Sequence, residues 1–228
     1  MSDAHAGQIE KYNSLIRECE VFLSCARDSG LQRETCSKLQ RFMTELENEK
    51  RAAVAARDED FANLLLGYQC VATCLDAEIT MWLLLKSAKP DEAWDSLVSA
   101  QMAAADAARA HPGFRHVLHQ AERLEAIEKL VFPPQVFVSA GMVVQRQECS
   151  ICGGEYGECG HLIGKPYWGE FCYTIARDIE FDHVAVVANP ADKRCRILHF
   201  PVEGGERNRM TWKIEESDAD TPASEEEN

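Results

Sequence analysis

Four cysteines and one histidine gather in a short stretch of the second half of this chain. Cys149 and Cys152 are separated by two residues, Cys159 and His161 by a single glycine, and Cys172 follows a little further on. Thiolate and imidazole are ligands that zinc prefers, and two close ligand pairs joined by a glycine-rich stretch can surround one ion. The spacing predicts a zinc site of Cys149, Cys152, Cys159 and His161, with Cys172 as the alternate ligand.

Two glycines stand where the chain must turn around such an ion. Gly153 and Gly154 directly follow Cys152, as in a zinc knuckle, where glycine lets the backbone fold around the metal and direct N–H groups at the thiolates. A closed site rich in sulfur has a structural role, whereas a catalytic zinc keeps one position open for water. We therefore expect structural Zn²⁺ rather than a catalytic metal.

The residues before this stretch follow a helical period and contain few turn signals. Apolar side chains recur at three- and four-residue steps, and the segments are bounded by Ser29-Gly30, by Asp58 or Asp60 as a cap, by Pro90 and by His111-Pro112-Gly113. Short breaks between helices favour antiparallel neighbours. We expect an antiparallel bundle of five helices over residues 9–26, 34–56, 58–87, 90–110 and 114–131, with the third helix at its centre.

Several side chains in the helical region are of chemically versatile types but are expected to serve packing or solvation. His116 and His119 lie three residues apart on one helical face and predict a solvated or packed pair. Cysteine within an apolar stripe acts as a small hydrophobe. Core packing is accordingly expected for Cys19, Cys25, Cys36, Cys70 and Cys74.

After Pro133 the period changes to that of strands. β-Branched runs predict four or five short strands over residues 135–139, 142–146, 180–188, 196–200 and 210–214. The cysteine run lies between them, so the zinc would staple an excursion from a small sheet. The sequence thus predicts an α+β protein with a helical bundle (1–132), a zinc-binding β module (133–213) and a disordered acidic tail (214–228).

Half of the net charge of −14 lies in that tail. Seven acids and no Lys or Arg follow Ile214, a composition typical of a solvated, disordered segment. Affinity for a phosphate backbone comes from clustered Lys and Arg, and Lys165 is the only basic residue between Cys149 and Cys172. The composition therefore argues against nucleic acid as the main partner.

Aromatic side chains near the cysteines leave nucleic-acid binding as a third hypothesis. Tyr156, Tyr167 and Trp168 could stack on bases. Glu155 and Glu158 beside them would repel a phosphate backbone. We expect the aromatic side chains to form a small core around the metal instead.

The compartment follows from what the first residues and the apolar runs contain. The N-terminus lacks a basic start followed by an apolar run, and the most apolar stretch, residues 79–85, is shorter than a membrane span. We expect a cytoplasmic protein without membrane association. Its ten cysteines are then expected to be reduced or metal-bound rather than disulfide-bonded.

Two segments that flank the cysteine run resemble a known family. Residues 183–192, His-Val-Ala-Val-Val-Ala-Asn-Pro-Ala-Asp, resemble the closing strand of the prohead maturation proteases of tailed phages. Residues 138–142, Val-Ser-Ala-Gly-Met, are similar to the strand that carries the serine nucleophile in that family, and the order of the two segments is the same. The resemblance implies Ser139 as a nucleophile activated by a histidine, acting in phage or prophage assembly.

The chain also departs from that family. His183 stands where the family has an acid, and Ala185 replaces its serine. The family's catalytic histidine lies on an upstream strand, whereas the residues before Pro133 predict helices. We therefore expect a protease-like sheet without its chemistry and no catalytic residue. The favoured function is a non-enzymatic zinc-binding interaction or scaffold protein whose helical bundle offers a surface to a protein partner, with the serine peptidase as the alternative.

Overall fold

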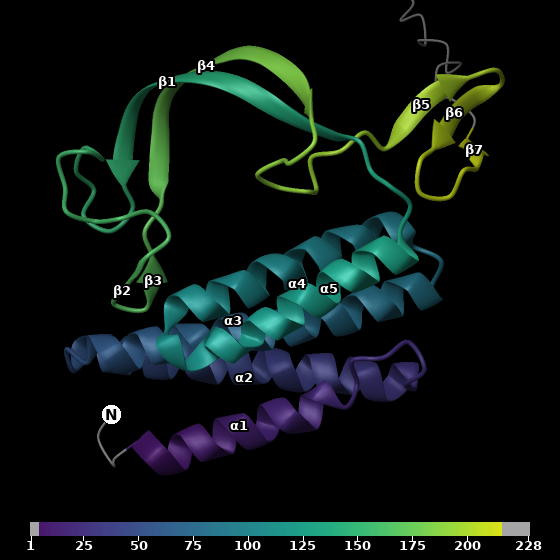
Figure 1. Ribbon diagram of the computed structural model, residues 1–228. Coiled ribbons are helices and arrows are strands. Elements are labelled where there is room, and N and C mark those ends of the chain that lie inside the picture. Colours follow the sequence, from purple (N-terminus) through teal and green to yellow (C-terminus); the bar gives the residue numbers. More distant parts are fainter. Residues whose placement is uncertain (1–4, 216–228) are drawn as a thin grey trace, which may run out of the picture.

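The computed structural model describes residues 5–215 and places a β region above a layer of helices (Figure 1). The helices are α1 (Ala6–Glu20), α2 (Ser29–Ala55), α3 (Glu59–Lys86), α4 (Pro90–Ala110), the 3-10 helix η2 (Pro112–Val117) and α5 (Leu118–Val131). The strands are β1 (Phe137–Cys149), β2 (Pro166–Tyr167), β3 (Glu170–Phe171), β4 (Thr174–Val187), β5 (His199–Val202), β6 (Gly205–Asn208) and β7 (Ile214–Glu215). The predicted α+β class is confirmed.

Two of the predicted helix starts are confirmed together with their physical cause. The side chain of Asp58 accepts a hydrogen bond of 3.1 Å from the N–H of Phe61 and so caps α3. Pro90 occupies the first turn of α4, where its missing N–H leaves no hydrogen bond unmade, and Asp91 follows it in that turn. Acidic side chains at this end also complement the helix dipole.

The first helix break differs from the prediction. Ser29 and Gly30 were expected to end the first helix, but they begin α2, because the side chain of Asp28 accepts a hydrogen bond of 3.0 Å from the N–H of Leu31. The first helix already ends at Glu20. Ser and Gly occur at both the start and the end of helices, so the Ser29-Gly30 pair is compatible with either position.

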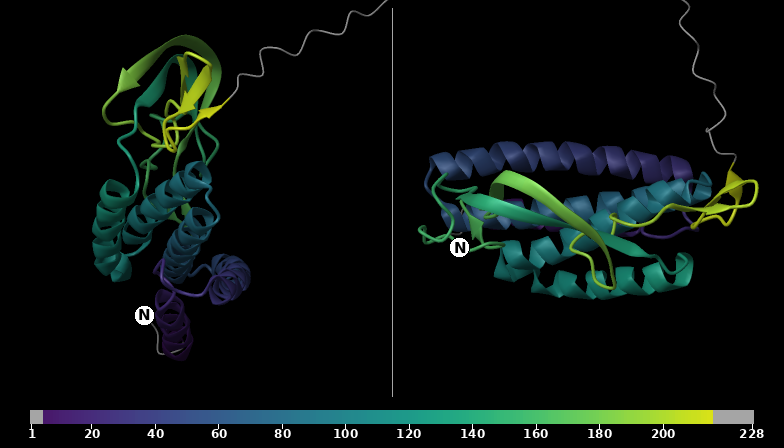
Figure 2. Two further views of the ribbon diagram at one scale, coloured as in Figure 1. Left: turned by 90° about the vertical axis from the view of Figure 1, so that its right-hand side faces the viewer. Right: turned by 90° about the horizontal axis from the view of Figure 1, so that it is seen from above.

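Helix α3 is the centre of the bundle, as predicted. It packs between α2 and α4, and side chains around its whole circumference are buried. Gly67 permits a close approach here, because a Cβ atom at this position would lie 2.1 Å from a ring carbon of Phe114. The end view of Figure 2 shows α2 and α4 on either side of this helix and α1 at the edge of the layer.

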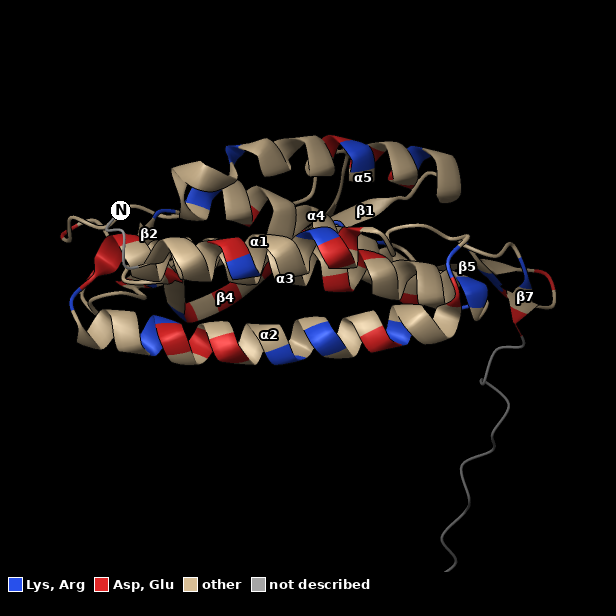
Figure 3. Cartoon of the chain, turned by 90° about the horizontal axis from the view of Figure 1, so that it is seen from below, with Lys and Arg blue, Asp and Glu red and all other residues tan. Residues whose placement is uncertain are grey.

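The outer face of the bundle is charged. Figure 3 shows acidic and basic residues interspersed along α2. Glu47, for example, lies 3.0 Å from the exposed Arg51, one turn further along the helix. Pairs of this kind contribute only a few tenths of a kcal/mol each, so this is a solvated face. Within the described residues, no helix is long and apolar enough to cross a membrane.

Strands β1 and β4 pair antiparallel as a two-stranded ribbon that arches over the helices (Figure 1). A bulge follows Gly141, where the imidazole of His183 crosses the strand; a Cβ atom on Gly141 would lie 2.4 Å from that ring. The strands predicted over 135–139 and 142–146 are therefore one strand, because the bulge bends it without ending it.

The last three strands form a small separate sheet in the order β5-β6-β7. Arg207 of β6 pairs with Ile214 of β7, so regular structure continues past residue 214, where the acidic tail was predicted to begin. Of the strand predicted over 210–214, only residue 214 lies in a strand. The rest of the predicted tail, residues 216–228, lies outside the described residues.

The β region contacts the bundle at two separated places. At the first, which we call the β2–β3 anchor, the N–H of Gly169 donates a hydrogen bond of 2.8 Å to Asn63 of α3, and the N–H of Trp168 donates one of 3.3 Å to Glu59. Gly169 has a φ of +79°, in the left-handed region, and sits against Lys50 of α2. This turn therefore fits closely into the surface of α2 and α3.

The second contact, which we call the α4 anchor, lies where the chain runs from β4 to β5. Arg196, of which 7% is exposed, forms an ion pair of 2.8 Å with Asp91 of α4. The indole N–H of Trp94 donates a hydrogen bond of 2.9 Å to the carbonyl of Lys193, whose ammonium lies 2.6 Å from Glu128 of α5. The ribbon thus spans the bundle between two polar anchors.

Candidate metal centre

Cys149, Cys152, Cys159 and His161 converge at one end of the β1–β4 ribbon. One donor atom from each, a thiol sulfur or an imidazole nitrogen, lies within 4.8 Å of the other three. The four ligands named from the sequence are therefore brought together. This group could hold a metal ion.

The first two cysteines are positioned by a tight turn at the end of β1. The N–H of Cys149, the last residue of the strand, donates a hydrogen bond of 2.8 Å to the carbonyl of Gly154, and the N–H of Gly153 donates one of 2.8 Å to the carbonyl of Cys149. Gly153 has a φ of +71°, which favours glycine. The turn carries Cys152 back over the end of the strand.

Cys172, the alternate ligand, also lies at this centre. Its sulfur is 3.8 Å from that of Cys149, and both side chains are buried. The N–H of Cys172 donates a hydrogen bond of 2.9 Å to the carbonyl of Lys165, so the base of the β2–β3 hairpin holds it in place. The centre thus contains five donors, one more than a tetrahedral site needs.

One ring nitrogen of His161 belongs to the group of converging donors. Its Nδ1 is buried and has no hydrogen-bond partner in the described residues, and a buried polar atom without a partner costs free energy. A bound metal ion would remove that cost. The ring meets Tyr167 edge-on at 4.7 Å between centroids.

The tyrosines support the loop that carries His161. The hydroxyl of Tyr167 accepts a hydrogen bond of 3.0 Å from the N–H of Leu162, and that of Tyr156 accepts one of 3.4 Å from the N–H of Ile163. These contacts agree with the expectation that the aromatic residues pack around the metal. Trp168, by contrast, is 41% exposed.

The surroundings of the centre favour ionisation of one thiol and oppose ionisation of another. Burial opposes ionisation of Cys149, but hydrogen bonds from the backbone of Cys152 and Ile151 and from the side chains of Cys159 and Cys172 together lower the pKa of this thiol to about 6. Burial and then the neighbouring Cys149 raise the pKa of Cys172. A second thiolate beside the first is disfavoured unless a cation joins them, which is the condition that a metal ion meets.

Ser139 lies on the same ribbon, far from the cysteine cluster in register. The two segments with the protease resemblance pair with each other, and Ser139 is exposed opposite Ala185. Among residues 5–215, no histidine is hydrogen-bonded to Ser139. His183 instead forms a contact of 2.9 Å with Asp182. The structure brings the two resembling segments together without a paired serine and histidine.

The cysteines of the bundle behave mostly as expected. Burial is the main cause that raises the pKa of Cys36, Cys70 and Cys74 to about 12, so these thiols stay neutral and packed. Cys19 is buried as well. The prediction is wrong for Cys25, which is exposed after the end of α1. His116 and His119 are exposed, in agreement with a solvated pair.

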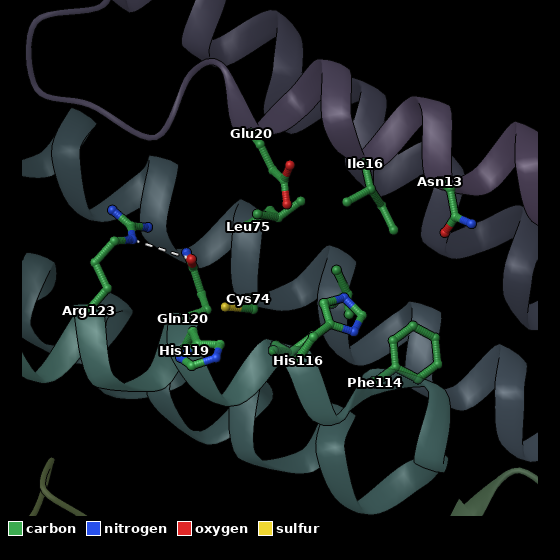
Figure 4. A pocket seen from close by; sticks show the side chains of 12 residues that line it. Asn13, Ile16, Glu20, Cys74, Leu75, Phe114, His116, His119, Gln120 and Arg123 are labelled. Atoms are coloured by element: carbon green, nitrogen blue, oxygen red, sulfur yellow. Dashed lines mark hydrogen bonds between the residues drawn. The ribbon is translucent and has the colours of Figure 1, made fainter.

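A cavity of about 310 Å³ lies between α1, α3 and α5 (Figure 4). Ile16, Leu75 and other apolar side chains line much of it. Its polar side chains include Gln120 and Arg123, which both hydrogen-bond the fully buried carboxylate of Glu78. These groups are engaged within the bundle, and we assign no chemistry to the cavity.

Comparison of the chain with family models, with curated proteins and with solved structures finds no match. A fold alone does not define a function. The function is therefore argued from the metal centre and from the surfaces that it supports.

Proposed function

We propose that this protein binds one structural Zn²⁺ through Cys149, Cys152, Cys159 and His161, and that it is a non-enzymatic interaction or scaffold protein. The convergence of these four donors within 4.8 Å is the observation that carries the proposal. Three thiolates and one imidazole form a known ligand set of structural zinc. Four protein ligands leave no position for a reacting water, which supports a structural role.

The spacing of the sulfurs supports zinc and explains why Cys172 competes for it. Two sulfurs bound to one zinc ion at about 2.3 Å, with the tetrahedral angle between them, lie about 3.8 Å apart. Cys149 and Cys172 have this separation, 3.8 Å. We assign the fourth position to His161, because its buried Nδ1 would otherwise stay without a partner, and Cys172 is the alternate.

The zinc would supply folding free energy that the polypeptide around it lacks. Between residues 150 and 173 only Gly169 and Cys172 are buried, so this segment has almost no apolar core. Metal binding can replace such a core in a small module. The ion would hold the end of the ribbon together with the β2–β3 anchor, and so present the ribbon to a protein partner.

Metal analysis of protein purified without chelators tests the site. We expect one zinc per chain, and loss of the zinc from Cys152→Ser and Cys159→Ser. The matched control is Cys25→Ser, since Cys25 is exposed and lies outside the centre. Less than one zinc-equivalent in the unaltered protein, or full zinc in Cys152→Ser, would contradict the proposal.

Cobalt spectroscopy separates the two ligand sets. Thiolate-to-metal charge-transfer bands report how many sulfurs bind Co²⁺ in place of zinc. With His161 as the fourth ligand, Cys172→Ser leaves the spectrum unchanged and His161→Ala alters it. The reverse result would assign the position to Cys172 while leaving the zinc site itself intact.

The interaction role has its own test. A protein partner should be retained from the native host by the zinc-loaded chain and by Cys25→Ser, and lost by Cys152→Ser. Equal retention by the zinc-free variant would show that the metal does not support the binding surface.

A further inference from the structure

The β1–β4 ribbon has two chemically different faces. Successive side chains of a strand point to opposite faces, and the register, with its bulge after Gly141, assigns each side chain to one of them. One face carries an unbroken apolar set, which we call the apolar ribbon face. Its members are Val138, Ala140, Met142 and Val144 of β1 and Ile179, Phe181, Val184 and Val186 of β4.

The apolar ribbon face is open to solvent. Five of its side chains are more than half exposed: Met142 (54%), Ile179 (53%), Phe181 (63%), Val184 (62%) and Val186 (71%). Single apolar side chains on a surface need no explanation, but a contiguous patch of this kind marks an interaction site. The other face of the ribbon is largely polar, with Ser139, Glu180 and His183 among its residues.

The helices do not cover this patch. Phe137, which belongs to the opposite face, packs against Trp94 of α4 with ring centroids 6.2 Å apart. At this end of the ribbon, the apolar face is therefore directed away from α4. Val184 and Val186, which lie close to Phe137 in the ribbon, are among the most exposed side chains of the patch.

The residues of this sequence outside 5–215 carry few apolar side chains. Residues 216–228 contain only Ala and Pro as apolar residues, and residues 1–4 add one Met and one Ala. A two-stranded ribbon is marginally stable unless a further layer packs on its apolar side. No third strand within residues 5–215 pairs with β4. The layer that would cover this face is therefore not found within residues 5–215.

We infer that the apolar ribbon face is a dimer interface, on which a second copy of this chain places its own apolar ribbon face across a two-fold axis. A two-fold interface requires a surface that is complementary to itself, and an uncharged apolar face meets that condition. Phe181 stands near the middle of the patch, so the two copies of this ring meet close to the axis.

The charges at the end of the face suit this symmetry. Arg146 and Arg177 lie beside each other on the same face, beyond the apolar set and towards the metal centre. A two-fold axis through the middle of the patch places the arginines of the two copies at opposite ends. The like charges are thereby kept apart, and the apolar parts remain in contact.

The area of the patch is sufficient for a specific dimer. Its five most exposed side chains would bury roughly 500 Å² on each copy, or about 1,000 Å² in total, which reaches the lower limit of specific interfaces. The strand backbone and the smaller side chains add to this. The inference does not depend on the identity of the metal.

Sedimentation analysis of the full chain tests the inference with a matched pair of variants. We expect the unaltered protein to sediment at twice the 25.6 kDa mass of one chain. Val184→Glu places a charge in each half of the interface and should weaken the dimer by roughly 100-fold or more. Val143→Glu is the control, since Val143 is 52% exposed on the opposite face, and it should remain dimeric.

Both variants must first show the far-ultraviolet circular dichroism spectrum and the metal content of the unaltered protein. If Val184→Glu misfolds, Phe181→Ser takes its place in the experiment. An unaltered protein that stays monomeric at its highest soluble concentration would overturn the inference and leave the face to a different protein. Equal dissociation of Val184→Glu and Val143→Glu would overturn it too, because the effect would not belong to one face.

Discussion

The helical bundle and the β region of this protein are stabilised by different interactions. The bundle buries a continuous apolar core, in which Leu39, Leu65 and Leu97 are fully buried. The buried residues after Pro133 are of another kind: two cysteines of the metal centre, Gly169, and two polar residues of the α4 anchor, Arg196 and Asn208. The bundle is thus stabilised by apolar burial, and the β region mainly by polar contacts and, in the proposed function, by the bound metal.

This difference suggests that the two regions lose structure separately. A core of contiguous apolar contacts gives cooperative unfolding, whereas a region held at a few points opens locally at lower free energy. Changes confined to one region should therefore leave the other largely intact. The following predictions test that separation.

The largest effect is expected from a cavity in the core of the bundle. Leu65→Ala should lower the free energy of unfolding by about 2–5 kcal/mol, because the fully buried side chain leaves a space that its neighbours fill only in part. Denaturant unfolding followed by circular dichroism measures this loss. The native variant should keep its metal.

The matched control for that cavity is Leu130→Ala in α5, since Leu130 is 85% exposed. Its effect should stay within about 0.5 kcal/mol. Loss of metal from native Leu65→Ala would show that the two regions are energetically one unit.

A smaller effect is expected at the α4 anchor. Asp91→Ala leaves the buried guanidinium of Arg196 without its carboxylate and should favour local opening by about 1.5–3 kcal/mol. The amide of Ile197, which donates to the carbonyl of Val136, should then exchange its hydrogen about 10- to 100-fold faster.

Glu92→Ala is the control for the α4 anchor, because Glu92 stands in the same helical turn and pairs only with exposed Lys89. It should change the exchange rate little. Faster exchange throughout the bundle in Asp91→Ala would mean that the anchor stabilises the helices as well.

A still smaller loss of stability is expected at the β2–β3 anchor, where a side chain at residue 169 would cause both backbone strain and a close contact. Gly169→Ala requires a left-handed conformation and puts a Cβ atom 3.2 Å from the carbonyl oxygen of Ala62. We expect local destabilisation of about 1–2 kcal/mol, seen as faster hydrogen exchange in the β2–β3 turn. Gly204→Ala is the control, because Gly204 also has a positive φ but a Cβ atom there would meet no atom within 4 Å. It therefore measures the effect of backbone strain alone. Equal local destabilisation in the two variants would show that the contact with Ala62 contributes nothing.

The smallest effect is expected for Ser139→Ala. The exposed hydroxyl makes no hydrogen bond within the described residues, so stability should change by less than about 0.5 kcal/mol. Intact-mass spectrometry during storage should give the same result for both proteins. A self-cleavage that disappears in this variant would instead support the serine-peptidase alternative.

Local patterns in the sequence predicted local structure well. Apolar periodicity, the cap at Asp58 and the proline in the first turn at Pro90 define two helices, and the close spacing of the cysteines predicts their convergence. The sequence did not predict the bulge at Gly141 or the position of Ser29-Gly30 at a helix start. A glycine alone does not distinguish a bulge within a strand from the end of a strand, or the start of a helix from its end.

Contacts between distant residues could not be predicted in this way. Asp91 was predicted only as part of a helix start and Arg196 only as part of a strand, yet the two side chains form an ion pair. Glu78, within the third predicted helix, is likewise fully buried beside Arg123, and no pattern in the sequence indicates this. Such pairs depend on how the elements pack, which spacing along the chain does not reveal.

The attachment of the ribbon at both ends has a consequence for how this chain can change in length. Surface segments usually tolerate insertions. Here two extra residues in each of the strands would lengthen the ribbon by roughly 7 Å, and the β2–β3 and α4 anchors could not both keep their places on the helices. A single extra residue in one strand would exchange the two faces beyond it. Related sequences should therefore keep the number of residues between the anchors, even where ribbon side chains outside the apolar ribbon face vary.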